Sequence, residues 1–160
     1  MNHLASTAAR LWQHRFAILL TGLAALPLLG AGAESDLQAA LQHVTAAFRA
    51  GDGARMEPVL PRRGKIRVSL PNLAGSAAGF VSASQFRYIL DDIFHRHEVK
   101  SFSLDPAGGA RQDEGTSVAA QLELRRQDQE ILRLSLQLVF VDTSEGWLLR
   151  EFREQARARP

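Results

Sequence analysis

The 160-residue sequence contains no cysteine, and Lys65 and Lys100 are its only lysines. The absence of cysteine excludes disulfide bonds, thiolate metal sites and a cysteine nucleophile. It also excludes a lipid attached to an amino-terminal cysteine after export. Without covalent cross-links, the chain has to be stabilised by burying its own apolar surface, and 46% of its residues are hydrophobic.

An excess of charge of either sign is also missing. The chain has 19 basic and 17 acidic residues. Arg10 and Arg15 lie in an amino-terminal segment without acids, and removal of that segment would leave 17 of each sign. A formally neutral chain lacks the basic surface typical of nucleic-acid-binding proteins. We therefore expect no nucleic-acid partner.

The amino-terminal segment has the layout of an export signal. Met1–Arg15 is basic, Phe16–Gly30 is almost wholly apolar, and Ala31-Gly32-Ala33 supplies the small residues of a cleavage site. The apolar stretch is shorter than the roughly 20 residues needed to span a bilayer, and Pro27 would kink it. The sequence predicts a signal peptide over 1–33, a periplasmic or secreted protein, and no membrane attachment after cleavage. A retained membrane anchor is the alternative.

The first part of the remaining chain shows helical periodicity. Ser35 and Gln38 form a possible capping box for a helix that Gly51-Asp52-Gly53 would end. A short helix over Ala54–Leu60 and a strand over Lys65–Leu70 follow. Pro71–Gly79 reads as a loop. Ser82 and Gln85 form a second capping box, which opens an amphipathic helix from Ala83 to about His95.

Beyond this helix the period of the apolar residues changes to two, which is typical of strands. Strands are expected over Ser101–Leu104, Val118–Leu124, Leu132–Phe140 and Trp147–Phe152. Helices followed by hairpin-connected strands predict an α+β domain, in which an antiparallel sheet wraps around the helices. This domain would cover 34–153, and 154–160 would be a polar tail.

The order of these elements carries a resemblance. A first helix that ends in Phe48-Arg49-Ala50-Gly51-Asp52, a second main helix and a meander that ends in Gly146-Trp147 resemble the nuclear transport factor 2-like superfamily. Shared features such as Ser84-Gln85, Phe94 and Glu151-Phe152-Arg153 also resemble uncharacterised secreted bacterial domains of unknown function. The resemblance implies a cystatin-like cone, a curved sheet cupped over helices. Because members include isomerases, dehydratases, ligand binders and interaction modules, the fold alone implies no activity.

One cluster contains residue types suited to acid–base chemistry: Tyr88, Asp91, Asp92, His95 and His97. At helical spacing, however, most of this cluster lies opposite the apolar stripe of Phe86, Leu90 and Ile93, so a solvated helix face explains it better. Asp91 and His95 have the i, i+4 spacing of metal ligands, but no HExxH or comparable motif accompanies them. We predict no catalytic residue, no metal site and no cofactor.

Two residue pairs near the end of the chain are candidate contacts. Arg150 and Glu151 are adjacent on a strand, so one of them should face the cupped side as a ligand contact or a residue at the cone mouth. Val139 and Val141 place apolar groups on the otherwise polar side of their strand. Either the chain itself covers these valines or they form a subunit interface.

These observations predict an exported, non-enzymatic domain that binds a small apolar ligand or a protein partner. A pocket enzyme of the proton-transfer isomerase or dehydratase type, with Arg150 or Glu151 inside, is the alternative. A structural homodimer is the third hypothesis. The state of the interior discriminates between them, because a cone filled with leucine and phenylalanine has no room for a substrate.

Overall fold

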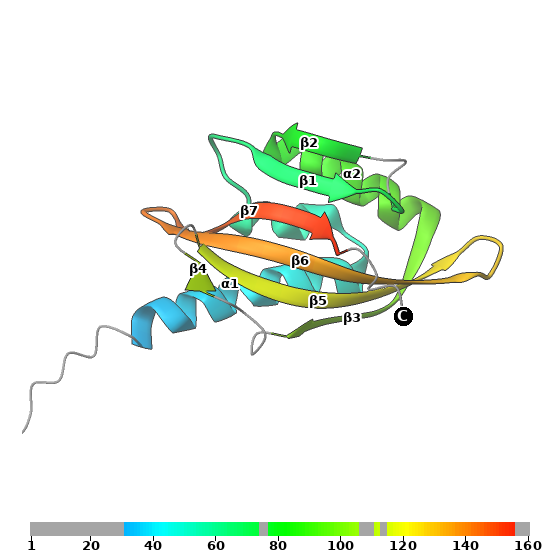
Figure 1. Cartoon of the computed structure of the whole chain (residues 1–160), viewed down its shortest axis with the longest axis horizontal. Helices are drawn as coiled ribbons and strands as arrows, with labels where there is room; N and C mark the ends of the chain where they lie inside the picture. The colour runs from blue at the N-terminus through cyan, green and yellow to red at the C-terminus, as the bar shows by residue number, and fades with distance from the viewer. Residues whose placement is uncertain (1–30, 74–76, 106–110, 113–114, 156–160) are drawn as a thin grey trace, which may run out of the picture.

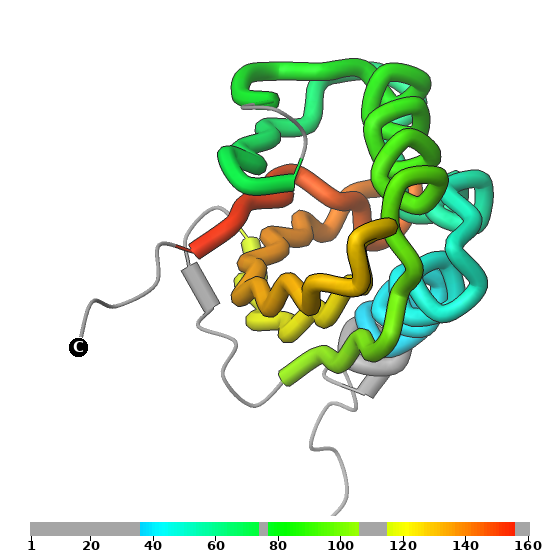
Figure 2. Tube along the Cα trace, turned by 90° about the vertical axis from the view of Figure 1, so that its right-hand side faces the viewer, coloured from blue at the N-terminus to red at the C-terminus, as the bar shows by residue number. Residues whose placement is uncertain are grey.

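The computed structural model describes residues 31–73, 77–105, 111–112 and 115–155. Helix α1 (Ala31–Ala50), the 3-10 helix η1 (Gly53–Val59) and helix α2 (Ala83–Arg96) lie on one face of a curved sheet (Figures 1 and 2). Residues 1–30 of the expected signal peptide and residues 156–160 of the expected polar tail lie outside the described residues.

The sheet has seven strands: β1 (Ile66–Leu70), β2 (Ala77–Val81), β3 (His97–Asp105), β4 (Arg111–Gln112), β5 (Gly115–Arg126), β6 (Ile131–Thr143) and β7 (Gly146–Glu154). Their order is β2-β1-β7-β6-β5-β3, and β4 pairs with β5. All pairs are antiparallel except β1 with β7, which is parallel. The α+β class with a curved sheet around helices is confirmed, and the parallel pair is an addition to it.

The helices follow their local sequence signals, with one exception. The capping box of α2 is present, because the Ser82 side chain accepts the Gln85 backbone N–H and the Gln85 side chain accepts the Ser82 backbone N–H. The cap expected at Ser35 is wrong, because α1 already begins at Ala31. Ala31, Ala33 and Glu34 are good helix formers, so the local cap signal did not decide where the helix starts.

Two strands differ from the expectation. The stretch Pro71–Gly79 was expected to be a loop, but β2 begins at Ala77 and pairs with β1 alone. Its alanines and glycine carry no alternation, so the pairing comes from the neighbouring strand. β3 begins at His97, ahead of the expected Ser101, and its pairing with β5 shifts register between Val99 and Ser101. This bulge interrupts the period of two that would have shown the longer strand.

The core lies between the concave face of the sheet and the three helices. Phe48 of α1 is at its centre: its ring stacks on Phe102 with centroids 4.2 Å apart and meets Phe94 edge to face at 5.3 Å. Phe86 of α2 meets Phe152 of β7 at 5.4 Å. Aromatic pairs at these distances add to the burial of their apolar area. The concave side of the cone is therefore held together by aromatic side chains from both helices and two strands.

Candidate functional site

The interior of the cone is filled. The largest side chains with almost no exposure are Phe48, Phe86, Phe140, Phe152, Met56, Ile66, Leu70, Leu90, Ile93, Leu122, Leu124 and Leu136. Within the described residues, Ser117 is the one buried polar side chain, and its strand partner Val139 lies outside the main core cluster. General acid–base catalysis needs titratable groups that reach a bound substrate. Among the described residues, the buried side chains include no titratable group.

The polar cluster on α2 is a solvated face, as its spacing indicated. Tyr88 is 75% exposed, His95 is exposed, and Asp92 pairs with Arg96 one turn along the helix. No group of potential metal ligands occurs in the part of the chain that the structure describes. Asp91 has a structural role, since its carboxylate accepts the backbone N–H of Gly53 at 3.0 Å and thereby holds the start of η1.

Arg150 and Glu151 do not point into the cone. The pairing of β6 with β7 shifts register between Val139 and Phe140, and Arg150 is the extra residue opposite this shift. Arg150 is exposed, whereas Glu151 lies beside Val139 and 3.6 Å from the Arg67 guanidinium on the face of the sheet away from the core. The bulge breaks the strict alternation on which the expectation of one inward charge rested. A ligand contact by Arg150 or Glu151 at the cone mouth stays a prediction.

Val139 and Val141 also lie on the convex face of the sheet. Val139 is only 8% exposed within the single chain, and Val141 is half-buried opposite Leu148. This burial favours coverage of Val139 by the chain itself, so the two valines offer little free apolar area. A subunit interface at this position stays a prediction.

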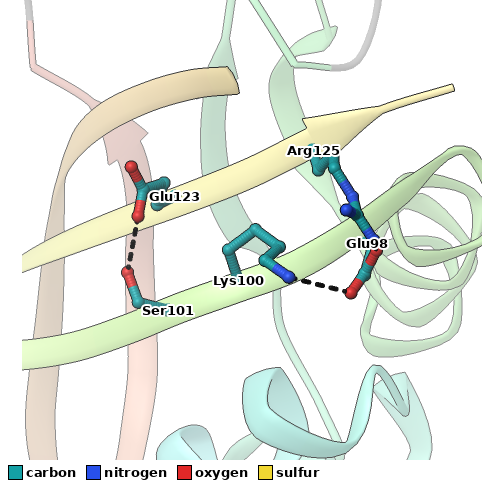
Figure 3. Close-up of polar contacts among 5 residues, drawn as sticks. All are labelled: Glu98, Lys100, Ser101, Glu123 and Arg125. Carbon is teal, nitrogen blue, oxygen red and sulfur yellow. Dashed lines mark hydrogen bonds and ion pairs between the residues drawn. The ribbon is translucent and has the colours of Figure 1, made fainter. Parts of the chain in front are cut away.

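Over β3, β5 and β6, the convex face carries a ladder of paired polar side chains. Glu98 accepts hydrogen bonds from Arg125 Nε at 2.8 Å and from Lys100 Nζ at 3.2 Å, and Ser101 donates to Glu123 at 3.5 Å (Figure 3). Arg133 adds a contact to Glu123 at 2.8 Å. Hydrogen bonds from Arg125 and Lys100 lower the pKa of the Glu98 carboxyl. Neighbouring strands thus neutralise each other's charges, which leaves this face without a strong charge of one sign.

The lowered pKa of Glu98 predicts a small pH dependence of stability. A carboxyl with a lowered folded-state pKa contributes stability above its unfolded pKa, about 4.3 for glutamate, and loses that contribution as the pH falls through the folded value. Glu98→Gln is therefore expected to lower the melting temperature slightly at pH 7, and by less at pH 3. Thermal melts at both pH values test this, with Glu145→Gln as the control in an exposed turn. A difference as large at pH 3 as at pH 7 would contradict the assignment.

A surface groove runs between α1 and the edge strand β3. It has a volume of about 740 Å³, and its lining residues are Gln38, Leu41, Gln42, Thr45, Ala46, Arg49, Ala50, Arg55, Phe102, Ser103 and Leu104. Its floor is apolar, its rim carries side-chain amides and hydroxyls, and one end carries two arginines. The sequence did not reveal this groove, because it depends on how α1 packs against a strand that follows it by about fifty positions.

A second cavity, of about 650 Å³, lies where η1, the start of α2 and the β6–β7 turn meet. Its lining contains two acids, Glu57 and Glu145, and two arginines, Arg62 and Arg87. Arg87 and Glu57 are 3.6 Å apart across it. Because the acids and arginines of this cavity balance each other's charge, the cavity is poorly suited to bind an anion or a cation.

No helix of the described residues is long and apolar enough to cross a membrane. No family model matches the sequence, and no curated relative is detected. Solved structures, in contrast, are similar over most of their length. A DUF4783 family protein from Bacteroides uniformis is 15% identical with a TM-score of 0.57, covering 74% of this chain and 97% of its own.

Two further solved structures are similar to this chain. A proposed dehydratase of the nuclear transport factor 2-like family from Streptomyces avermitilis is 14% identical with a TM-score of 0.56, covering 75% of this chain and 92% of its own. A protein from Kribbella flavida is 9% identical with a TM-score of 0.60, and the match covers 80% of this chain and 93% of that protein. At these identities the likeness concerns the fold alone. The chain has the curved, helix-filled fold of the nuclear transport factor 2-like proteins, and its structural neighbours include bacterial domains of unknown function.

Proposed function

We propose that this chain is an exported, non-enzymatic interaction domain that binds a protein partner through its surface. The observation that carries the proposal is the packed interior, in which Phe48 is almost fully buried and stacks on Phe102. The solved neighbours include a proposed dehydratase. A dehydratase-type reaction needs a titratable group beside the substrate, and the described interior contains none.

The form of the surface favours a protein partner over a small apolar ligand. Sites for small molecules are concave and bury most of the ligand's surface. The groove between α1 and β3 is instead open along the edge of the sheet, and its lining alternates apolar, amide and guanidinium groups. An open groove of mixed polarity suits a segment of polypeptide, which presents apolar side chains and backbone polar groups together.

Site-specific photo-crosslinking in the native host tests this proposal. A photoreactive phenylalanine analogue at Thr45, in the groove, is expected to trap a discrete protein partner. The same analogue at Ser135 is expected to trap none, because the polar side chains of that face, such as Arg133 and Glu123, pair with one another. Equal labelling at both positions, or none at Thr45, would contradict the proposal.

Export is a separate part of the proposal and has its own test. Expression of the full chain in bacteria, followed by fractionation and amino-terminal sequencing, is expected to yield a periplasmic or secreted protein that begins at Glu34. Support comes from the basic, apolar and small-residue order of the first 33 positions. A membrane-bound product that retains residues 1–33 would support the anchor alternative instead.

A further inference from the structure

The two halves of the edge strand β3 differ. Its first half carries Glu98 and Lys100 and contains the bulge between Val99 and Ser101. Charges and bulges on an edge strand block pairing with another chain. The stretch Ser101–Leu104 carries no charge and keeps a regular register with β5, and Asp105 ends the strand. The charges and the bulge that protect an edge therefore flank Ser101–Leu104 and leave this stretch of β3 without them.

The uncharged stretch Ser101–Leu104 borders the groove. Phe102, Ser103 and Leu104 line it from the strand side. Phe102 is buried against Phe48 of α1, whereas Leu104 is half-buried. A strand added at this edge would place alternate side chains over α1, against Leu41 and Ala46. The sheet thus offers backbone hydrogen-bonding groups and an apolar floor at the same place.

The charges of the groove are of one sign. Among its lining residues, Arg49 and Arg55 are the charged ones. Arg55 already contacts the Asp52 carboxylate at 3.2 Å. Arg49 is exposed and makes no ion pair with any residue that the structure describes. A carboxylate at this end of the groove would find an available guanidinium.

The direction of the elements decides which carboxylate fits. α1 and β3 run in opposite directions (Figure 1), so the arginine end of the groove lies towards the start of β3 and Leu104 lies towards the start of α1. A strand that pairs antiparallel with β3 would enter near Leu104 and end near Arg49. Its last residue would then carry its free carboxylate to the arginine end.

We propose that the groove between α1 and β3 binds the free carboxyl-terminal segment of a partner protein as an added antiparallel strand. The segment pairs with Ser101–Leu104, places alternate apolar side chains against Leu41, Ala46 and Phe102, and ends with its carboxylate at Arg49. Main-chain hydrogen bonds supply affinity in this mode, and the side-chain contacts supply specificity. This inference rests on the proposed function and names the class of partner.

A displayed library of random heptapeptides with free carboxyl termini, selected against the full chain, tests the inference. Expected winners alternate apolar and polar residues up to the carboxyl terminus. Amidation of the winning peptide is expected to weaken binding about fivefold or more, since a charge contact is lost. N-methylation of the peptide nitrogens that would face β3 should abolish binding. N-methylation of the nitrogens between them, which would face away from β3, should be tolerated. Hydrogen exchange should show new protection at Ser101–Leu104.

Charge reversal at two exposed arginines supplies the matched comparison. Arg49→Glu is expected to weaken the peptide about fivefold or more, whereas Arg63→Glu, outside the groove, should leave binding unchanged. No selected peptide, equal effects of the two variants, or protection that maps to the other edge at Ala77–Val81 would overturn the groove inference. The proposed interaction function fails separately, if photo-crosslinking at Thr45 traps no partner.

Discussion

Phe48→Ala is expected to lower the free energy of unfolding by about 4 kcal/mol, a large part of the 5–15 kcal/mol typical of a domain. Phe48 is 1% exposed and contacts three aromatic rings, at centroid distances of 4.2 Å to Phe102, 5.3 Å to Phe94 and 6.0 Å to Phe152. Truncation removes the transfer free energy of the ring and leaves a cavity that α1 and the sheet cannot close completely.

Urea unfolding of the full chain measures this loss, and Tyr88→Ala is the matched control. Tyr88 is also an aromatic residue on a helix, but it is 75% exposed, so its truncation should change stability by no more than about 0.5 kcal/mol. Phe48→Leu should recover most of the loss if the full truncation fails to fold. A cost below about 1 kcal/mol for Phe48→Ala would show that α1 does not close the cone as described.

The second large effect is expected at the start of β5. Gly115→Ala should destabilise the domain by about 3 kcal/mol, because two penalties coincide. Gly115 has a φ of +148°, a conformation that residues with a side chain rarely adopt. An added Cβ would also lie closer than 3.0 Å to the carbonyl oxygen of Phe140 on the neighbouring strand. Because this oxygen belongs to the backbone, it cannot move without disturbing the pairing of β5 with β6.

Gly79→Ala separates the two penalties. Gly79 has a φ of +134°, but an added Cβ would find nothing within 4 Å. Its substitution should therefore cost only the conformational strain, about 1–2 kcal/mol. Thermal melts of both variants measure the difference. Equal destabilisation would contradict the close approach of β6 to Gly115.

The elements that could be predicted are those whose signals are local. Ser82 and Gln85 gave the start of α2 because a capping box needs only neighbouring residues. The alternation at Ile66, Val68 and Leu70 gave β1 because one face of that strand is buried. β2 could not be predicted, since its pairing with β1 depends on a partner in the sheet and its own sequence has no period.

The candidate site depended on long-range packing, so the sequence revealed little of it. The α2 cluster was correctly interpreted as a solvated face, because helical spacing alone decides which side is buried. Arg150 and Glu151 could not be oriented, since the bulge at Arg150 follows from pairing with β6. The α1–β3 groove combines residues about fifty positions apart, and no local pattern joins Thr45 and Arg49 with Phe102.

The central claim is that the cone is filled, and uptake of benzene by the full chain tests it most directly. Methyl NMR spectra of the unmodified chain should show no specific shifts of the core leucine and isoleucine signals with benzene. Phe48→Ala, which removes the central ring, provides the positive control, because an apolar cavity of sufficient size binds benzene. Saturable benzene binding to the unmodified chain, with shifts at Leu90, Leu122 and Leu136, would contradict the account and restore the pocket-enzyme alternative.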